Sequence, residues 1–528
     1  MIIGIDFGTC FSSVSYMSGS RPISDLLSNL EFKASGLPTQ FAYSRFNNSE
    51  VFAKDCQRLE AEFGGVVKYI KRTIREHPDN INKTVISNGK SYTYGQIVKR
   101  YLSYLIVQTQ LEAKKRGLDP TIEQIAIACP VAIASGQMTS TGYREFLMNT
   151  VKEITNLPTN NIHIIEEPVA AAMAYLYYED LNKTYSKNQT VLVFDLGGGT
   201  LDVTVVEHDS VNNTHFIKAK EGDLELGGNE WDAELMEFVL EEADIDDIDD
   251  FTDPYEKNRF LEKITELKHD LTEYLDSDIS FSFNGSRIRG IEVTRDDFED
   301  LTEHLLDRAI EVTKKAINFA RAHGTSSIDK IILVGGSCNM PQIQRRMREE
   351  FPHIGANNII AFQPSKAIAN GAAMYNKRQS TYKDIFGTKP PIEPVDIATH
   401  TYGFGSKNNG KDMIYNLIYR GTPIRDRIVA KSTISFIAVQ DDQEIITFRV
   451  YESDAEKEMY VGEENWFDYG LNENRNGLEV SIDIPSEYLG RARQFNTWVT
   501  LSLDKNGILS IAITDENGRE IDHAQKQI

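Results

Sequence analysis

Residues 191–202, VLVFDLGGGTLD, contain the residue types needed to hold a phosphate group. The β-branched and aromatic run predicts a buried strand that reaches Asp195 and then enters a turn of glycines. Glycines allow positive φ angles and let backbone N–H groups approach an anion. Asp195 can hold a metal-bound water, and Thr200 can donate its hydroxyl to a phosphate oxygen. A simple turn is the alternative explanation of these glycines.

The same order of features occurs at the N-terminus. Residues 2–12, IIGIDFGTCFS, place Asp6 before a turn at Gly8 and Thr9, and a third glycine turn follows an apolar strand at 331–337, IILVGGS. Three unrelated hairpins remain possible, but they do not predict two aspartates in equivalent positions. Two phosphate-binding hairpins that face each other across a cleft do predict this repetition.

The composition is that of a globular protein with several domains. A chain of 528 residues leads us to expect roughly two to four domains. Its 41% hydrophobic and 26% charged residues exclude a disordered or membrane class, and the net charge of −23 argues against a general nucleic-acid binder. Scattered cysteines and a strand directly after Met1 favour a cytoplasmic location. The acidic run at 241–253 predicts a solvated loop, since a calcium loop needs an internal glycine.

The chain resembles the actin-like ATPase superfamily and, within it, the heat-shock protein 70 family of chaperones. Besides the three glycine turns, the resemblance rests on further blocks in matching order: VVKYIKRTIR around Lys71, IAIACP ending at Pro130, IIEEPVAAAMAY around Glu167, GDLELGGNEWD around Gly227 and SKAIANGAA around Gly371. The match extends from the first residue to about Asn376 and continues more weakly almost to the end. A divergent, bacterial-type member is implied.

The resemblance implies roles for the polar residues of a nucleotide cleft. Lys71 would neutralise γ-phosphate charge and position the attacking water, although the basic cluster at 68–75 is also typical of a solvated helix face. Glu167 would orient that water or stabilise the magnesium shell; a glutamate there also complements a helix N-terminus. Asp6 and Asp195 would act on Mg²⁺ through bound waters. The predicted catalytic residues are Lys71, Glu167, Asp195 and Thr200.

The resemblance also implies a site for ATP or ADP built mainly from turns. Asn339 occupies the position of an arginine that stacks on adenine, Thr265 that of a glutamate partner of Lys268, and Ser365 that of an aspartate near the ribose. Because a stacked arginine contributes on the order of 1 kcal/mol, we expect phosphate and Mg²⁺ binding with altered base recognition. The predicted nucleotide-binding residues are Asp6, Gly8, Thr9, Cys10, Phe11, Gly197, Gly198, Gly199, Gly227, Gly228, Lys268, Gly335, Gly336, Ser337 and Asn339.

The expected architecture is α/β with an added antiparallel domain. Residues 1–378 would form an actin-like (ribonuclease H-like) ATPase domain of two lobes, about 1–185 and 186–378, followed by a linker at 379–395. Met138 stands where the family has a relay arginine after the switch proline, Pro130. Strands such as TISFIAV, EIITFRVY and ILSIAIT recur between turn signals in 396–528, which predicts a β-sandwich.

The C-terminal domain resembles the peptide-binding domain of the chaperones, without the helical lid that follows it in the family, so we expect rapid exchange of a bound client. The resemblance places Phe404, Phe436, Ile446 and Phe448 around a peptide pocket; ordinary core positions are the alternative.

The resulting hypothesis is a slow ATPase whose lobes close on nucleotide and couple to the binding of an unfolded peptide or a dedicated protein client, with possible co-chaperones and neither nucleic acid nor membrane as partner. A nucleotide-sensing scaffold or regulator with little turnover is the main alternative. A filament-forming actin relative and a sugar kinase are further alternatives, which polymer sedimentation and sugar-independent ATP hydrolysis would separate.

Overall fold

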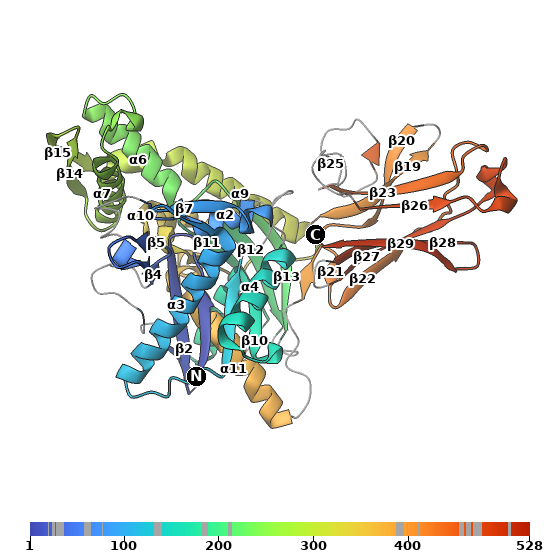
Figure 1. Cartoon of the computed structure of the whole chain (residues 1–528), viewed down its shortest axis with the longest axis horizontal. Helices are drawn as coiled ribbons and strands as arrows, with labels where there is room; N and C mark the ends of the chain where they lie inside the picture. Colours follow the sequence, from blue (N-terminus) through green and yellow to red (C-terminus); the bar gives the residue numbers. More distant parts are fainter. Residues whose placement is uncertain are drawn as a thin grey trace. The chain divides into compact units, whose positions relative to one another are not determined.

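The computed structural model has mixed α/β architecture, as predicted from the sequence (Figure 1). It divides into two compact units, one formed by residues 1–138, 143–215 and 219–393, the other by 394–528 with short segments at 139–142 and 216–218. The structure describes residues 1–19, 21–23, 27, 36–56, 65–76, 78–130, 140–181, 188–209, 214–386, 395–398, 400–408, 411–453, 459–460, 466–467, 478–504 and 508–527.

The first sheet of unit 1 has the strand order β10-β9-β1-β2-β3, with β4 paired to β2. β1 pairs antiparallel with β2 and parallel with β9, which in turn pairs parallel with β10. The IAIACP block is a buried strand that ends before Pro130, as predicted. The strands are β1 (Ile2–Asp6), β2 (Phe11–Ser18), β3 (Arg21–Ile23), β4 (Leu37–Pro38), β9 (Gln124–Cys129) and β10 (Ile162–Glu166).

The second sheet repeats the central part of the first. Its order is β13-β12-β11-β16-β17, in which β11 pairs antiparallel with β12 and parallel with β16. The β11–β12 hairpin thus corresponds to β1–β2, as the repeated strand, aspartate and glycine pattern predicted. The strands are β11 (Gln189–Leu196), β12 (Leu201–Asp209), β13 (Thr214–Asp223), β16 (Lys330–Val334) and β17 (Ile359–Ala361).

Helices and small hairpins cover these sheets. α6, α7 and the β14–β15 hairpin lie together at one end of the unit in Figure 1. The helices are α2 (Ile70–Glu76), α3 (Tyr94–Lys115), α4 (Ser140–Thr155), α5 (Glu167–Leu181), α6 (Gly228–Glu242), α7 (Pro254–Glu273), α8 (Arg295–Leu301), α9 (Glu303–Ala322), α10 (Pro341–Glu350) and α11 (Ala367–Phe386). The hairpin strands are β5 (Phe41–Ser44), β6 (Ser49–Phe52), β7 (Thr84–Ser87), β8 (Lys90–Thr93), β14 (Asp276–Phe283) and β15 (Ser286–Thr294).

Helix α5 packs closely against α11, and small residues make that approach possible. A Cβ atom on Gly371 would lie 1.8 Å from the carbonyl oxygen of Ala170, and one on Gly4 would lie 2.2 Å from the backbone nitrogen of Ala373. The Asn376 amide donates to the Ile3 carbonyl at 3.0 Å, which ties α11 to β1. The predicted close packing of the alanine-rich helix is confirmed, and it fixes the N-terminal end of α5 beside β10.

Helix α11 extends further than the domain boundary predicted from the sequence. It continues through Phe386, so residues 379–386 of the expected linker are helical. The first helix-breaking residue in that region is Gly387, and the prolines come later, so nothing in the sequence ends the helix sooner. Residues 387–394 lie outside the described part of the chain.

Among the described residues, unit 2 contains two larger antiparallel sheets with a shared apolar core and a small third one, in which β18 pairs with β21. One has the order β24-β20-β19-β23-β25 with β26 on β23, and the other has the order β22-β27-β28-β29. In β28, Leu509, Ile511 and Ile513 are buried while the residues between them are partly exposed, which is the pattern of a strand with one covered face. The strands are β18 (Asp396–Ile397), β19 (Thr401–Asn408), β20 (Lys411–Ile418), β21 (Pro423–Ile424), β22 (Arg427–Lys431), β23 (Ile445–Ser453), β24 (Met459–Tyr460), β25 (Trp466–Phe467), β26 (Glu479–Asp483), β27 (Trp498–Asp504), β28 (Ile508–Thr514) and β29 (Glu520–Gln527).

The strand predicted at TISFIAV is wrong. Residues 433–439 contain only an isolated antiparallel bridge between Phe436 and Thr497. Just before this segment the side chain of Ser432 accepts a hydrogen bond from the backbone N–H of Val499 at 3.1 Å. A serine hydroxyl that takes a ladder donor in this way competes with regular strand pairing. The apolar pattern of the segment therefore reflects contact with the core at Phe436 rather than a strand.

Candidate functional site

The two repeated hairpins bring carboxylates to corresponding strand ends. Asp6 is the last residue of β1, and its register partner on β2 is Ser13. Asp195 lies near the end of β11, where its register partner is a second aspartate, Asp202 on β12. Asp195 and Asp202 are both buried, and Glu167 at the start of α5 is buried as well. The structure thus adds Asp202, which the sequence analysis did not assign, to the predicted group.

These carboxylates interact strongly enough to perturb one another. Burial, reinforced by Glu167, raises the pKa of Asp6 to about 7 from its usual 3.8, with Lys71 acting in the opposite direction. Burial and the charges of Glu167, Asp202 and Asp6 raise the pKa of Asp195 well above its usual range. Burial raises the pKa of Asp202 to about 6, although Arg75 lowers it. Burial is the largest cause in each case, so the charged forms of these carboxyl groups are disfavoured, and a bound cation would stabilise them.

Lys71 and Glu167, both predicted to be catalytic, form a buried ion pair. The Lys71 Nζ atom lies 2.5 Å from Oε1 of Glu167, and the side chains are 6% and 7% exposed. Lys71 comes from the first turn of α2, whereas Glu167 begins α5 directly after β10. The lysine thus lies beside the carboxylate cluster, as the resemblance implied, and not on a solvated helix face. An arriving phosphate would compete with Glu167 for its ammonium group.

Three glycine turns from distant parts of the chain meet beside this cluster. The backbone N–H of Gly228 donates to the Gly197 carbonyl at 2.9 Å, and the hydroxyl of Ser337 donates to the same carbonyl at 2.8 Å. A Cβ atom on Gly227 would lie 2.5 Å from the backbone nitrogen of Gly199. One on Gly335, whose φ is +86°, would lie 2.6 Å from Oδ1 of Asp195. Only glycine fits at Gly227 and Gly335, and the absence of a side chain there is what allows the turns to approach one another so closely.

The N-terminal glycine turn, between β1 and β2, also lies against these turns through Gly8, Thr9, Cys10 and Phe11. A Cβ atom on Gly8 would lie 2.0 Å from the Phe11 carbonyl, and one on Gly198 would lie 2.4 Å from Sγ of Cys10. Thr9 also approaches the second turn, with its methyl 3.4 Å from a Cβ atom placed on Gly199. Burial raises the pKa of Cys10 to about 11, so the thiol is neutral and adds no repulsion toward a phosphate.

Lys268 has a different acidic partner from the one that the family pattern supplies. Its Nζ atom lies 2.8 Å from Oδ1 of Asp232 on α6 and donates to the Gly228 carbonyl at 2.6 Å. The hydroxyl of Thr265 donates to the other oxygen of Asp232 at 3.1 Å. Glu266 instead lies 60% exposed near Arg259, as expected for a neighbouring helix position. Lys268 is therefore held against the glycine turn by Asp232, and Thr265 orients that aspartate.

Asn339 cannot substitute for a stacking cation. Its side-chain amide donates to the Gly336 carbonyl at 2.9 Å, so the group folds back onto its own turn. Met138, the other departure from the family, lies outside the described residues, but Arg144 on α4 donates to the Ile164 carbonyl of β10 at 3.0 Å.

A divalent cation with its water shell fits the carboxylate cluster. The charges of Asp6 and Asp202 both act on Asp195, and magnesium takes few carboxylates while keeping several waters. Asp6 and Asp195 are the residues that would face it. Across the ranges covered by the structure, no three histidine, cysteine or acidic side chains form a direct metal-ligand set.

Comparison with known proteins assigns the chain to a family. The family model described as "Hsp70 protein" matches residues 149–527, more than half of the chain. The chain belongs to the Hsp70 family. A "Chaperone protein DnaK" from Metamycoplasma hominis is 30% identical over 84% of this chain and 68% of its own length. Those of Anaplasma marginale (strain St. Maries) and Mycoplasmoides gallisepticum are 27% and 28% identical, over 98% and 100% of this chain and 75% and 82% of theirs.

In this Hsp70 protein, the residues predicted to bind peptide lie mostly in the core of unit 2. Phe404, Ile446 and Phe448 are buried, and Phe436 is half-buried, with its ring 4.7 Å from that of Phe404. Several of their sequence neighbours are instead exposed and apolar, and these were not singled out from the sequence. This exposed apolar set consists of Ile434, Ile437, Val439 and Ile445, each between 46% and 52% exposed.

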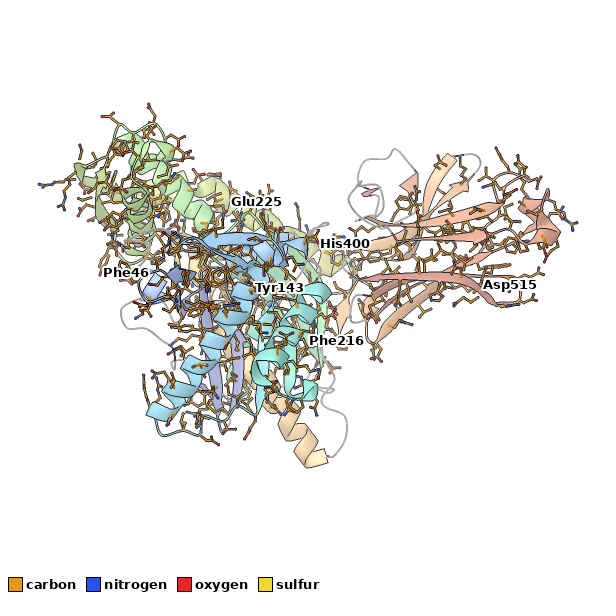
Figure 2. All side chains as sticks on the ribbon, viewed as in Figure 1. Phe46, Tyr143, Phe216, Glu225, His400 and Asp515 are labelled. Atoms are coloured by element: carbon orange, nitrogen blue, oxygen red, sulfur yellow. The ribbon has the colours of Figure 1, made fainter. Side chains whose placement is uncertain are left out.

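Figure 2 shows the side chains of both units; the labelled Tyr143 of α4 is buried in unit 1, whereas Phe46, at the turn between β5 and β6, is exposed.

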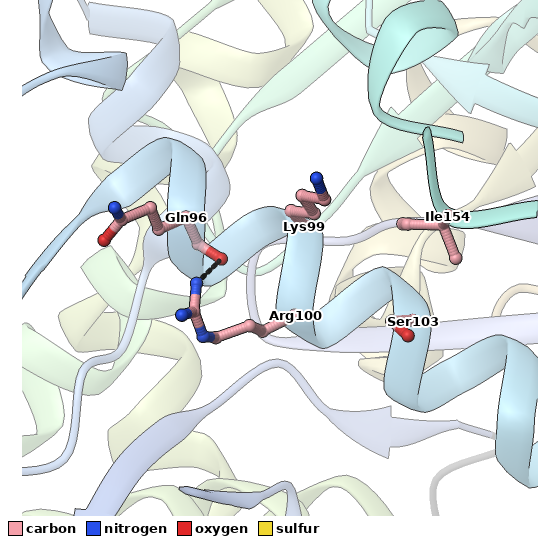
Figure 3. A pocket seen from close by; sticks show the side chains of 5 residues that line it. All are labelled: Gln96, Lys99, Arg100, Ser103 and Ile154. Carbon is pink, nitrogen blue, oxygen red and sulfur yellow. Dashed lines mark hydrogen bonds between the residues drawn. The ribbon is translucent and has the colours of Figure 1, made fainter. Parts of the chain in front are cut away.

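A separate surface pocket of about 470 Å³ lies along α3, lined by Gln96, Lys99, Arg100 and Ser103, with Ile154 of α4 (Figure 3). Lys99 and Arg100 already have acidic partners, Glu153 at 2.6 Å and Glu50 at 2.7 Å. None of the helices in the described ranges has the length and apolar character to cross a membrane.

Proposed function

We propose that this Hsp70 family protein is a chaperone that binds and slowly hydrolyses ATP, closes its nucleotide cleft in doing so, and couples that closure to peptide binding by unit 2. The observation that carries the proposal is the carboxylate cluster of Asp6, Glu167, Asp195 and Asp202 beside the converging glycine turns. Buried like charges destabilise a fold unless a ligand balances them. Membership of a family of ATP-binding chaperones supports the same reading.

The chemistry required of the protein is alignment and charge balance. Phosphoryl transfer needs little covalent help, because its transition state spreads charge over the phosphoryl oxygens. Magnesium, when bound, would offset phosphate charge and leave the acidic cluster neutralised. Lys71 would exchange its contact with Glu167 for the transferred phosphate, which leaves the Glu167 carboxylate to accept a hydrogen bond from the attacking water. Thr200 and the glycine N–H groups would hold the phosphates in place.

The exposed apolar set of unit 2 is the surface that we assign to client binding. Ile434, Ile437, Val439 and Ile445 are adjacent in sequence to the half-buried Phe436 and to the start of β23. Exposed apolar side chains are typical of surfaces that bind apolar partners. An extended, apolar peptide segment is therefore the expected client, and the buried residues Phe404 and Phe448 would support this surface from within.

A nucleotide-sensing scaffold is the second candidate, and the closed Lys71–Glu167 pair favours it. If that pair stays closed when ATP binds, Lys71 is not available to the phosphate and turnover stops. Single-turnover hydrolysis, measured with excess protein, Mg²⁺ and labelled ATP and with or without an unfolded peptide, separates the candidates. Hydrolysis that peptide accelerates supports the coupled chaperone, whereas tight ATP binding without hydrolysis supports the scaffold.

A further inference from the structure

Two consecutive glutamates at the junction of β10 and α5 hold lysines from different parts of unit 1. Glu167 contacts Lys71, as described above, and Glu166 contacts Lys220 of β13, with 2.9 Å between Oε1 and Nζ. The Glu166 and Lys220 side chains are 6% and 4% exposed, so this second pair is also buried. Neither residue was among the site residues predicted from the sequence.

The second pair joins the two sheets. β10 is the edge strand of the first sheet and β13 is the edge strand of the second, so Glu166–Lys220 connects elements that share no hydrogen-bonded ladder. Glu166 is the last residue of β10, and Glu167 is the first residue of α5. A movement of Lys220 with its sheet therefore acts on the residue next to Glu167 in the chain.

We propose that Glu166 and Lys220 are positioning residues that couple the orientation of the second sheet to the Lys71–Glu167 pair. Buried opposite charges resist separation, because each would be left uncompensated in a medium of low dielectric constant. The β10–α5 junction therefore moves together with Lys220 when the two sheets change their relative orientation. Glu167 is thereby moved toward or away from Lys71, which sets how readily Lys71 can turn to a phosphate.

The consequence for hydrolysis rests on the proposed ATPase function, but the coupling itself has an independent readout. Amide hydrogen exchange at residues 162–181, with and without Mg²⁺·ATP, reports on the junction whether or not hydrolysis occurs. The variants are Lys220→Met, Glu166→Gln, the neutral double variant Glu166→Gln/Lys220→Met, and the exchanged pair Glu166→Lys/Lys220→Glu. Lys99→Met is the matched control, because Lys99–Glu153 is an exposed ion pair with a 2.6 Å contact.

The neutral double variant, which removes both charges of this pair together, is expected to bind ATP within about twofold of the unaltered protein but to hydrolyse it about tenfold more slowly in a single turnover, a usual size of coupling between sites. Its nucleotide-dependent exchange at 162–181 should also be lost. The variant with the two charges swapped, Glu166→Lys/Lys220→Glu, should recover most of the hydrolysis rate and most of the nucleotide-dependent hydrogen exchange. Lys99→Met should change neither quantity.

A neutral double variant with unaltered hydrolysis and an unaltered exchange response would overturn the coupling. The coupling would also be overturned if ATP did not change amide hydrogen exchange at residues 162–181 of the unaltered protein. If the unaltered protein shows the exchange response but does not hydrolyse ATP, the proposed ATPase function fails while the coupling stands.

Discussion

The carboxylate cluster of unit 1 and the apolar core of unit 2 both contain residues that the sequence assigned to function, with opposite physical consequences. In the cluster the groups are carboxylates, and burial raises the pKa of Asp6 to about 7 and that of Asp202 to about 6. In unit 2 the buried groups are Phe404, Ile446 and Phe448, whose burial is favourable by itself. Buried like charges therefore point to a ligand, whereas buried aromatic rings need none.

This contrast predicts different costs for substitution in the two regions. Removing a buried ring from unit 2 should reduce stability, whereas removing a buried carboxylate from the cleft should reduce function. Substitutions in the exposed apolar set of unit 2 should also reduce function rather than stability, because these side chains lie in water and do not stabilise the fold.

The largest effect on stability is expected from Phe404→Ala in unit 2. The Phe404 side chain is fully buried and contacts the rings of Phe436 and Phe448. Its truncation leaves a cavity, so the free energy of unfolding should fall by about 3–5 kcal/mol, as measured by denaturant unfolding. A change below about 1 kcal/mol would show that the ring is not a core residue and would restore it as a candidate for direct peptide contact.

The largest effect on turnover is expected from Lys71→Ala. Loss of a preorganised charge from a transition state slows a reaction by about 10²–10³-fold, so single-turnover hydrolysis should fall by that factor. Nucleotide binding, measured by calorimetry, should be largely retained, because the glycine turns are unchanged. Lys114→Ala, at an exposed lysine of α3, is the control. Turnover equal to that of the control would remove Lys71 from the mechanism.

A smaller effect of opposite sign on stability is expected from Asp195→Asn. The folded-state pKa of Asp195 is raised, so the folded protein binds a proton that the unfolded chain releases above its usual value of 3.8. Without nucleotide, the stability of the protein should therefore decrease as pH rises through this window. At pH 8 the variant should be more stable by roughly 1–3 kcal/mol, and the difference should shrink toward pH 4.

The same variant should lose most of the magnesium dependence of ATP binding. A magnesium titration identical to that of the unaltered protein would contradict the assigned role of Asp195. Equal stability of the two proteins at pH 8 and pH 4 would show instead that the carboxylate is not unfavourably buried.

The smallest effect is expected from Ile437→Ser in the exposed apolar set. Ile437 is 46% exposed, so stability should change by less than about 0.5 kcal/mol. Affinity for an apolar peptide should fall by about 1 kcal/mol, or about fivefold in Kd, as measured by fluorescence anisotropy. Val429→Ser is the control, because Val429 is 64% exposed on a different strand, β22. Equal affinity in the two variants would separate this surface from client binding.

The sequence identified two members of the carboxylate cluster but none of the exposed apolar set of unit 2. Asp6 and Asp195 were recognisable because each follows an apolar strand and precedes glycines, a pattern that depends on local chemistry alone. Asp202 was missed although it lies in the same segment, because its approach to Asp195 depends on the register of β11 and β12. A predicted hairpin with its turn at residues 197–200 would have placed Asp195 opposite Asp202.

Contacts between distant elements could not be predicted from the sequence. Lys268 was expected to lack its acidic partner, but Asp232 reaches it from α6, and Glu166 reaches Lys220 across two sheets. Such pairs depend on how helices and sheets pack, which apolar periodicity does not specify. In unit 2 the resemblance placed Phe436 and Ile446 around a peptide pocket, with core positions as the alternative, and an apolar pattern alone does not distinguish a pocket from a core.

We propose that a magnesium-bound nucleotide balances the charge of the carboxylate cluster. Thermal unfolding at pH 8, with ATP and Mg²⁺ or with ATP and a chelator, can show whether it does. At about 100 times the Kd, ATP with Mg²⁺ should add about 2.7 kcal/mol of stability, and ATP with the chelator should add far less. Equal stabilisation under both conditions, or none with Mg²⁺·ATP, would contradict the claim.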